Sequence, residues 1–180
     1  MDERKWIERI LAGDTQSFSC LVAKYEKMAY TIALRILENR EEAEEAVQDA
    51  FVKMYRALSD FHFDSKFSTW FYRIVYRTAL TALRQQRMFV SYEEAGPVDL
   101  SNDEVESATA LLEREDRKEM IARTLKKLPA DEALLLTLYY LEECSVEEIC
   151  QITELSASNV KVKLFRGRKR FYEVLQDKMK

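Results

Sequence analysis

Glycine and proline are scarce in this sequence, which has only three glycines and two prolines among 180 residues. An all-β fold needs a turn roughly every 8–12 residues, and glycine and proline supply many of those turns. The dominant residue types are instead Ala, Leu, Glu, Lys and Arg, which favour helices. The sequence therefore predicts an all-α fold.

The length and the apolar content suit one ordinary domain or two small ones. Apolar residues make up 47% of the chain, yet no apolar run approaches the ~20 residues that a membrane-spanning helix needs. The odd set of cysteines, Cys20, Cys144 and Cys150, without a secretory signal, indicates reduced thiols in a cytosol. With a single histidine, His62, and no Cys-x-x-Cys pair, we expect a cytoplasmic protein without membrane insertion, metal or other cofactor.

Hydrophobic periodicity and capping residues divide residues 1–87 into four expected helices. Gly13 ends the first helix, and Asp14 and Asn39 can cap the second and the third. A loop at residues 59–64 precedes the fourth. We expect these helices at residues 2–12, 15–36, 40–58 and 65–86.

Residues 88–107 differ in character from both flanks. They contain Gly96-Pro97 and six acidic residues with little periodicity, which predicts a flexible linker. This linker separates an N-terminal domain, residues 1–87, from a C-terminal domain, residues 108–180. In the second domain we expect helices at residues 108–127, 129–142, 145–152 and 157–176.

The last two expected helices fit a helix-turn-helix. Ser145 and Glu148 form a capping box at the start of the first, and Leu155 can fill the turn at residues 153–156. Apolar residues recur along one face of the last helix, and Gly167 among them suggests close packing against the first helix of the motif. The opposite face carries Lys161, Val162, Phe165, Arg166, Lys169 and Arg170.

This outer face predicts contact with DNA. A recognition helix lies in the major groove, where Arg and Lys can bond guanine and apolar side chains can meet the thymine methyl. A basic helix face is often only a solvated surface, but Phe165 would be poorly placed there without a partner. Residues 161–180 hold eight basic and two acidic residues, a net +6 in a chain of −4, so the remainder carries −10. This asymmetry indicates two partners of opposite character.

A second cationic stripe is expected on the helix at residues 65–86. Its members share one face: Lys66, Trp70, Arg73, Arg77 and Arg84. Basic side chains can hold phosphates while a base stacks on Trp70, an arrangement that suits single-stranded DNA. Trp70 could equally be an ordinary, partly buried core residue, and the pattern alone leaves both interpretations open.

Several segments resemble conserved regions of one protein family. Residues 44–51 (EEAVQDAF) and 67–74 (FSTWFYRI) are similar to the second region of sigma-70-family factors. Leu128-Pro129, followed by residues 145–168, is similar to the fourth region of that family. The order, the spacing and the linker resemble the extracytoplasmic-function (ECF) subfamily of RNA polymerase sigma factors, and the likeness spans about residues 7–176.

The resemblance implies roles for individual residues. Three match positions that dock on a coiled coil of the polymerase β′ subunit: Glu45, Gln48 and Asp49. Five match the loop that captures a flipped base of the −10 element: Phe61, His62, Phe63, Asp64 and Ser65. The stripe from Lys66 to Arg84 matches the strand-opening helix. The −35 readers would be Ser156, Ser158, Lys161, Val162, Lys163, Phe165, Arg166, Lys169 and Arg170. Arg77 and Thr81 stand where the subfamily often has Asn and Asp, so the −10 preference does not carry over.

The function implied by the resemblance is transcription initiation, not catalysis. Such a factor binds the β′ and β subunits of core RNA polymerase and promoter DNA, is commonly held by an anti-sigma factor, and needs no small-molecule substrate. The acidic linker would be either a plain tether or a mimic of RNA in the polymerase cleft. The alternative is a conventional helix-turn-helix regulator that acts without binding core polymerase, which would predict a ligand pocket or alternating strands and helices upstream. An enzyme or an adaptor that binds only protein fits less well, given one histidine, no glycine-rich phosphate loop and the basic face of residues 161–170.

Overall fold

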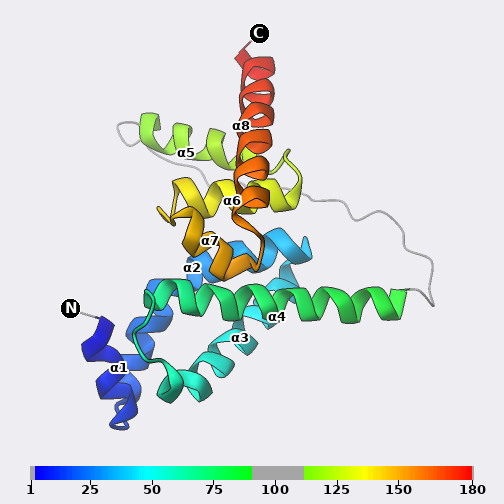
Figure 1. The fold of residues 1–180 in the computed structure, drawn as a ribbon. Helices are drawn as coiled ribbons and strands as arrows, with labels where there is room; N and C mark the ends of the chain where they lie inside the picture. The colour runs from blue at the N-terminus through cyan, green and yellow to red at the C-terminus, as the bar shows by residue number, and fades with distance from the viewer. Residues whose placement is uncertain (1–2, 91–111, 180) are drawn as a thin grey trace.

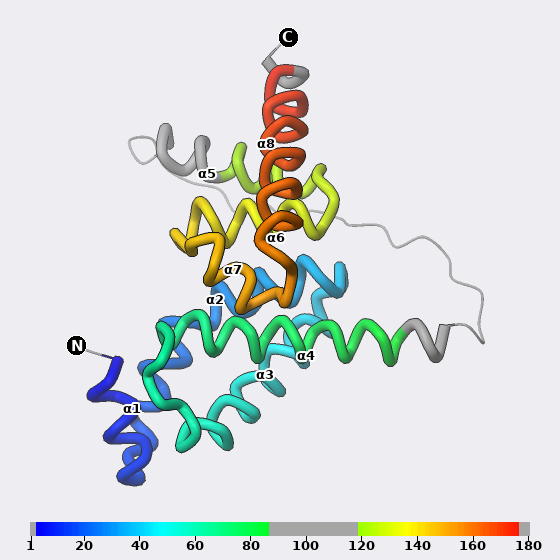
Figure 2. The backbone as a smooth tube through the Cα atoms, in the orientation of Figure 1, coloured from blue at the N-terminus to red at the C-terminus, as the bar shows by residue number. Residues whose placement is uncertain are grey.

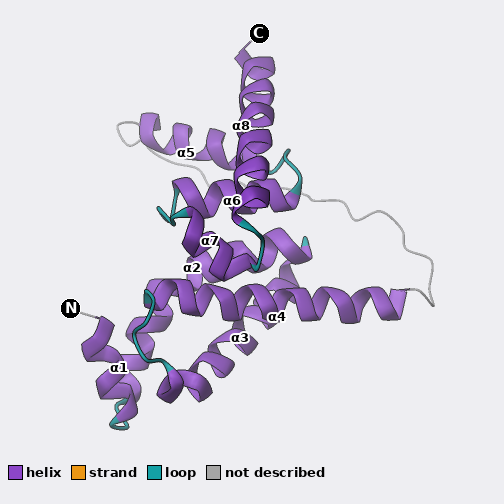
Figure 3. Ribbon diagram, viewed as in Figure 1, coloured by secondary structure: helices purple, strands orange, loops and turns teal. Residues whose placement is uncertain are grey.

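The computed structural model describes the backbone of residues 3–90 and 112–179, with the side chains of residues 3–86 and 119–176. Over these residues the chain forms helices and no strand, which confirms the all-α prediction (Figure 3). The elements are α1 (Glu3–Leu11), α2 (Thr15–Leu37), α3 (Arg40–Ala57), the 3₁₀ helix η1 (Leu58–Asp60), α4 (Phe67–Val90), α5 (Leu112–Leu125), α6 (Ala130–Tyr140), α7 (Val146–Thr153) and α8 (Ala157–Met179). In the described part of the chain, no helix is long and apolar enough to cross a membrane.

Some element boundaries differ from those expected. Helix α4 runs four residues further than predicted, to Val90, because nothing in the sequence interrupts a helix before Gly96. Most of the expected linker lies within residues 91–111, outside the described residues. Pro129 precedes α6 as its N-cap and does not form its first turn, and the expected loop after α3 begins as the short 3₁₀ helix η1.

The capping predictions at Asp14 and Asn39 are confirmed. The Asp14 Oδ1 atom accepts hydrogen bonds from the backbone N–H groups of Gln16 and Ser17, at 2.9 and 3.4 Å. The Asn39 Oδ1 atom accepts one from the Glu42 N–H at 3.2 Å. Because these N–H groups have no partner within their own helices, the caps fix where α2 and α3 begin.

Helices α2, α3 and α4 pack around an aromatic core (Figure 1). Phe71 of α4 is fully buried, with its ring centre 4.8 Å from that of Phe51 and 6.0 Å from that of Tyr25. Phe67, Val75 and Thr78 are buried on the same face, and Ile74 is partly buried. This burial fixes the rotation of α4, and it leaves the cationic stripe on a different side of the helix.

Helix α6 lies at the centre of the C-terminal half, and most of its residues are buried. Helix α8 crosses it at Gly167, where a β-carbon would lie 3.2 Å from Leu136 Cδ1 and 3.3 Å from Glu132 Cβ. The close packing predicted at Gly167 is therefore correct, but its partner is α6 and not α7, the first helix of the motif. Hydrophobic periodicity shows which face of a helix is buried, but it does not show which helix covers that face.

The two halves of the chain lie against each other. Helix α7 packs along α4, and α6 packs against α2 (Figures 1 and 2). Helix α8 begins near this contact and extends away from it toward the C-terminus. The sequence predicted two helical domains, but it contained no indication that their surfaces meet.

Candidate nucleic-acid interface

Helices α7 and α8 form the helix-turn-helix predicted from the sequence. The capping box is present: Glu148 N–H donates to Ser145 Oγ at 3.1 Å, and Ser145 N–H donates to Glu148 Oε2 at 2.8 Å. Glu154 ends α7 in the left-handed conformation, with φ at 62°, and its N–H donates to the Cys150 carbonyl at 2.8 Å. Leu155 packs against the core within the turn. These contacts fix the direction in which α8 leaves the turn.

The two faces predicted for α8 are confirmed. Val160 and Leu164 are buried, whereas the Phe165 side chain is 65% exposed and that of Val162 is 46% exposed. The remaining exposed members of the outer face are Lys161, Arg166, Lys169 and Arg170, with Ser156 and Ser158 exposed at the start of the helix. Exposed apolar side chains among cations suit a helix that contacts bases in the major groove.

Two predicted DNA-contacting residues of α8 also hold α6. Lys163 forms an ion pair with Asp131, and Arg170 Nη1 lies 3.1 Å from Glu132 Oε1. The Glu132 side chain is only 7% exposed, and its Oε2 atom has no hydrogen-bond partner among the described residues. Arg170 therefore neutralises a buried carboxylate. The only sign of these ion pairs in the sequence is the pair of adjacent acids at the start of α6. Periodicity within α8 does not reveal which of its basic residues bind them.

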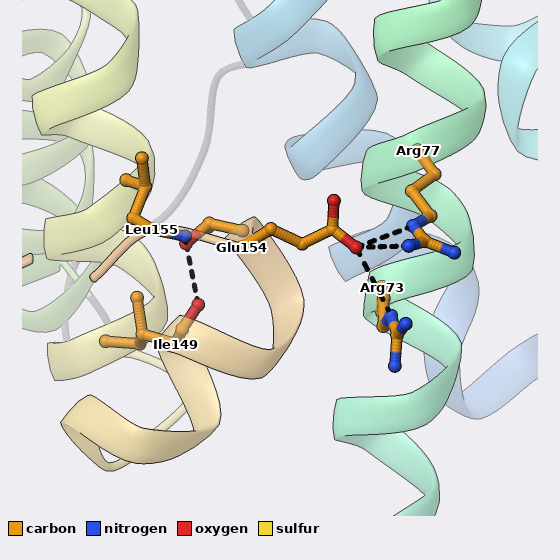
Figure 4. Close-up of polar contacts among 6 residues, drawn as sticks. Arg73, Arg77, Ile149, Glu154 and Leu155 are labelled. Carbon is orange, nitrogen blue, oxygen red and sulfur yellow. Dashed lines mark hydrogen bonds and ion pairs between the residues drawn. The ribbon is translucent and has the colours of Figure 1, made fainter. Parts of the chain in front are cut away.

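The cationic stripe of α4 faces the C-terminal half. Lys66 Nζ lies 2.9 Å from Glu148 Oε1. Arg77 Nε donates to Glu154 Oε1 at 2.9 Å, and Arg73 Nε lies 3.8 Å from the same oxygen (Figure 4). Three of the five stripe residues thus bind two acids that belong to α7 and its C-cap.

The aromatic residues near the start of α4 lie closer to the core than the DNA-binding hypothesis expects. The Trp70 side chain is half-buried, with its ring centre 5.0 Å from that of Phe61, which is itself buried. Phe63 is exposed, and the Arg4 guanidinium lies 4.7 Å from the centre of its ring. Of the other predicted residues, His62, Asp64 and Arg84 are exposed and Ser65 is half-buried. Trp70 is therefore partly a core residue, while the tip of the loop stays accessible.

The residues predicted to dock on polymerase lie on one exposed face of α3. They are Glu45, Gln48 and Asp49. Glu45 and Asp49 line a groove of about 440 Å³ between α3 and α4. At one end of this groove Gln86 Nε2 donates to Glu42 Oε1 at 3.0 Å, which ties the two helices together. The acidic face thus lies on a helix that packs against α4.

The side chains of Glu148 and Lys66, which join the two halves, are both charged at neutral pH. Burial opposes ionisation of Glu148, but hydrogen bonds from the Ser145 backbone and Lys66 lower the pKa of this carboxyl below its ordinary value. The bond to Glu148 raises the pKa of Lys66. Burial raises the pKa of Tyr72, whose hydroxyl donates to Glu142 Oε2 at 2.7 Å. The two ions therefore face each other fully charged, and Tyr72 remains a hydrogen-bond donor.

Comparison with known proteins gives a match for each half of the chain. Residues 21–88 match the family model Sigma-70 region 2, and residues 118–171 match Sigma-70, region 4. The RNA polymerase sigma-H factor of Pseudomonas aeruginosa is 32% identical over 181 residues, which cover 97% of this chain and 94% of that protein. The ECF RNA polymerase sigma-E factor of Escherichia coli is 31% identical over 169 residues, covering 90% and 88%.

The chain belongs to the ECF group of the sigma-70 family. Two solved structures share the fold of this sigma factor. The sigma factor RpoE of Bartonella quintana, in complex with the anti-sigma factor NepR, has a TM-score of 0.72 and 18% identity, covering 89% of this chain and 98% of that one. CnrH, in complex with the cytosolic domain of CnrY, has a TM-score of 0.63 and 21% identity, covering 97% of each chain.

The match to the family shows that the contact between the halves of this sigma factor joins its two conserved regions. Lys66, Arg73 and Arg77 lie in region 2, and their partners Glu148 and Glu154 lie in region 4. The sequence predicted only a capping role for Glu148 and no role for Glu154. A contact between surface charges that are about 80 positions apart in the sequence leaves no local pattern, so sequence reasoning could not find it.

Proposed function

We propose that this ECF sigma factor binds core RNA polymerase and directs it to promoters, with α8 reading the −35 element and the start of α4 contacting the −10 element. The supporting observation is the outer face of α8, where Phe165 and Val162 lie exposed among cations in a helix-turn-helix that matches region 4. The chain recruits and positions the polymerase. Phosphodiester chemistry belongs to the polymerase core.

The proposed −35 contacts follow from the orientation of α8. Arg166 and Lys161 are exposed and can reach base edges or phosphates in the major groove. Phe165 and Val162 can meet thymine methyl groups. The ion pairs of Lys163 and Arg170 with α6 assign these two residues partly to holding α8 in place.

At the −10 element, basic residues of α4 would hold phosphates of the opened strand. Flipping a base out of the stack costs a few kcal/mol, and stacking on an aromatic ring offsets about 1–3 kcal/mol per base. Phe63 at the loop tip and the open side of Trp70 are the rings available for this. His62 and Asp64 flank the loop tip and are exposed.

Docking on the polymerase is proposed for the acidic face of α3. Glu45, Gln48 and Asp49 share this face and are exposed, so they can meet the β′ subunit without any change in the core. Region 4 would in turn contact the β subunit. We further propose that the chain acts in the cytoplasm, beside the polymerase, and that an anti-sigma factor binds and regulates it. The complex of RpoE with the anti-sigma factor NepR supports this proposal.

Transcription with purified components tests the proposed function against the alternative of a conventional regulator. Core RNA polymerase should initiate at discrete promoters only when this chain is added, and mapping of the transcript ends should identify them. A regulator that acts without core binding would bind DNA by itself and would change transcription only by holoenzymes that already carry another sigma factor.

Arg166→Ala and Lys169→Ala should affect promoter binding in different ways. If Arg166 contacts a base, its removal should cost about 1–3 kcal/mol at one −35 position and relax the preference there. Lys169 lies along the outer edge of the same face, so Lys169→Ala should weaken binding to all promoters alike and reduce its salt dependence. Holoenzyme binding to a library of single-base promoter variants measures both effects. Uniform loss of affinity in both variants would show that α8 is rotated differently in the groove.

A further inference from the structure

The contact between α4 and α7 pairs the charges of the surface that this sigma factor would use at the −10 element. Lys66, Arg73 and Arg77 supply most of the charge of the α4 stripe, and all three bind acids of region 4. Their partners, Glu148 and Glu154, come from α7 and its C-cap alone. A single helix therefore holds the basic side of α4.

Further hydrogen bonds from region 2 hold region 4 in the same place. The buried Thr69 hydroxyl donates to Glu148 Oε1 at 3.5 Å, and the buried Tyr72 hydroxyl donates to Glu142 Oε2 at 2.7 Å. On the far side of the interface, Arg35 Nη1 donates to the Leu125 carbonyl at 3.2 Å. Lys66, Thr69, Arg73 and Arg77 follow one another at intervals of three or four residues, so they lie along one side of α4 that faces region 4.

The outer face of α8 is left open in this arrangement. Phe165 is the most exposed large apolar residue in the described part of the chain, and Lys161, Arg166 and Lys169 are exposed beside it. The chain thus leaves the proposed −35 surface open, whereas three cations of the proposed −10 surface are paired with its own acids. The outer face of α8 stays open because α7, not α8, packs on α4.

In the ion pairs on α4, another anion can replace the carboxylate. The side chains of Arg73, Arg77 and Glu154 are each about half exposed, at 46%, 55% and 52%. Ion pairs in such positions are weak and are screened by salt. DNA phosphates present the same charge and the same hydrogen-bond acceptors as the two carboxylates, so a strand entering this surface can replace them.

We propose that Glu148 and Glu154 of region 4 act as an internal substitute for the DNA backbone, which keeps the α4 surface closed until the regions separate. This inference rests on the proposed role of α4 at the −10 element. In the free chain, the −35 surface is available while the −10 surface is occupied. Separation of the regions, as the chain spreads over the polymerase, then releases Lys66, Arg73 and Arg77 together.

The double variant Glu148→Gln with Glu154→Gln tests the proposal in the full chain. Gln can replace Glu in the capping box, and neither side chain is needed for the core, so the fold should persist. Removing the ion pairs should raise the ratio of open to closed molecules roughly threefold to tenfold, since exposed pairs contribute little each. Small-angle X-ray scattering at low salt should then show a larger radius of gyration than for the unmodified chain.

The matched control removes two negative charges from region 4 without touching the interface. Glu119 and Glu147 are exposed, and neither forms an ion pair or hydrogen bond to α4 in the described structure. Glu119→Gln with Glu147→Gln should therefore leave the scattering unchanged. Fluorescence anisotropy with a short, random-sequence single-stranded DNA should show roughly threefold to tenfold tighter binding for the interface variant than for this control.

The possible outcomes separate the two ideas. If the interface variant scatters like the control, Glu148 and Glu154 do not hold the chain closed, and the proposal is wrong. If it opens but binds DNA no better than the control, the covered surface is not a DNA site and the masking is contradicted. Arg73→Ala with Arg77→Ala, assayed for promoter opening in holoenzyme, tests the proposed function by itself. Normal opening by that variant contradicts the role of α4, whatever the scattering shows.

Discussion

Replacing Asp49 by Arg should abolish association with core RNA polymerase while leaving the helical fold intact. Asp49 is exposed on α3, at the edge of the groove that Glu45 also lines, and the buried face of the helix lies on the other side. If this acidic face docks on a basic surface, an arginine there places like charges against each other. Such a contact costs several kcal/mol, so the affinity should fall by about 10²-fold or more.

Glu26→Arg is the matched control for this variant. Glu26 is exposed on α2, away from the α3 groove, and its replacement changes the net charge by the same amount. Copurification with tagged core enzyme should succeed for Glu26→Arg and fail for Asp49→Arg, with unchanged circular dichroism in both. Holoenzyme formation by Asp49→Arg at the normal level would place the polymerase contact elsewhere on the chain.

Local sequence signals predicted the elements of this sigma factor well. The capping residues Asp14, Asn39 and Ser145 each form the expected hydrogen bonds, because a cap depends only on neighbours within three positions. The buried and exposed faces of α4 and α8 also follow the predicted periodicity, since each helix contributes one stripe to a core. Exposure of Glu45, Gln48 and Asp49 follows from the same reasoning on α3.

Contacts between helices that are distant in sequence were beyond this kind of prediction. The prediction that Gly167 packs closely is confirmed, but the predicted partner helix, α7, was wrong, because Gly167 packs against α6. The ion pairs of Arg77 with Glu154 and of Arg170 with Glu132 join positions 77 and 38 residues apart. Surface charges carry no periodic pattern that identifies a partner, so the docking of region 4 on region 2 requires the three-dimensional structure.

The contact of Arg170 with Glu132 has a large expected effect on stability. Replacing Arg170 by Ala leaves the Glu132 carboxylate, 7% exposed, without the cation that lies 3.1 Å from it. An uncompensated buried carboxylate is strongly destabilising, although the half-exposed position of Arg170 lets water reach part of the site. We expect Arg170→Ala to lower the free energy of unfolding by about 2–3 kcal/mol.

Urea unfolding of Arg170→Ala and Lys169→Ala distinguishes this structural role from DNA contact. The Lys169 side chain is 72% exposed, and its Nζ atom lies 4.0 Å from Oε1 of the exposed Glu173. Removing this side chain should therefore change the free energy of unfolding by less than about 0.5 kcal/mol. Adding Glu132→Gln to Arg170→Ala should recover part of the loss, because a neutral amide is less costly to bury than a carboxylate. Equal stability of the two single variants would mean that Arg170 serves DNA alone. A loss confined to Arg170→Ala, and relieved by Glu132→Gln, would show that one residue of the recognition helix also anchors that helix to α6.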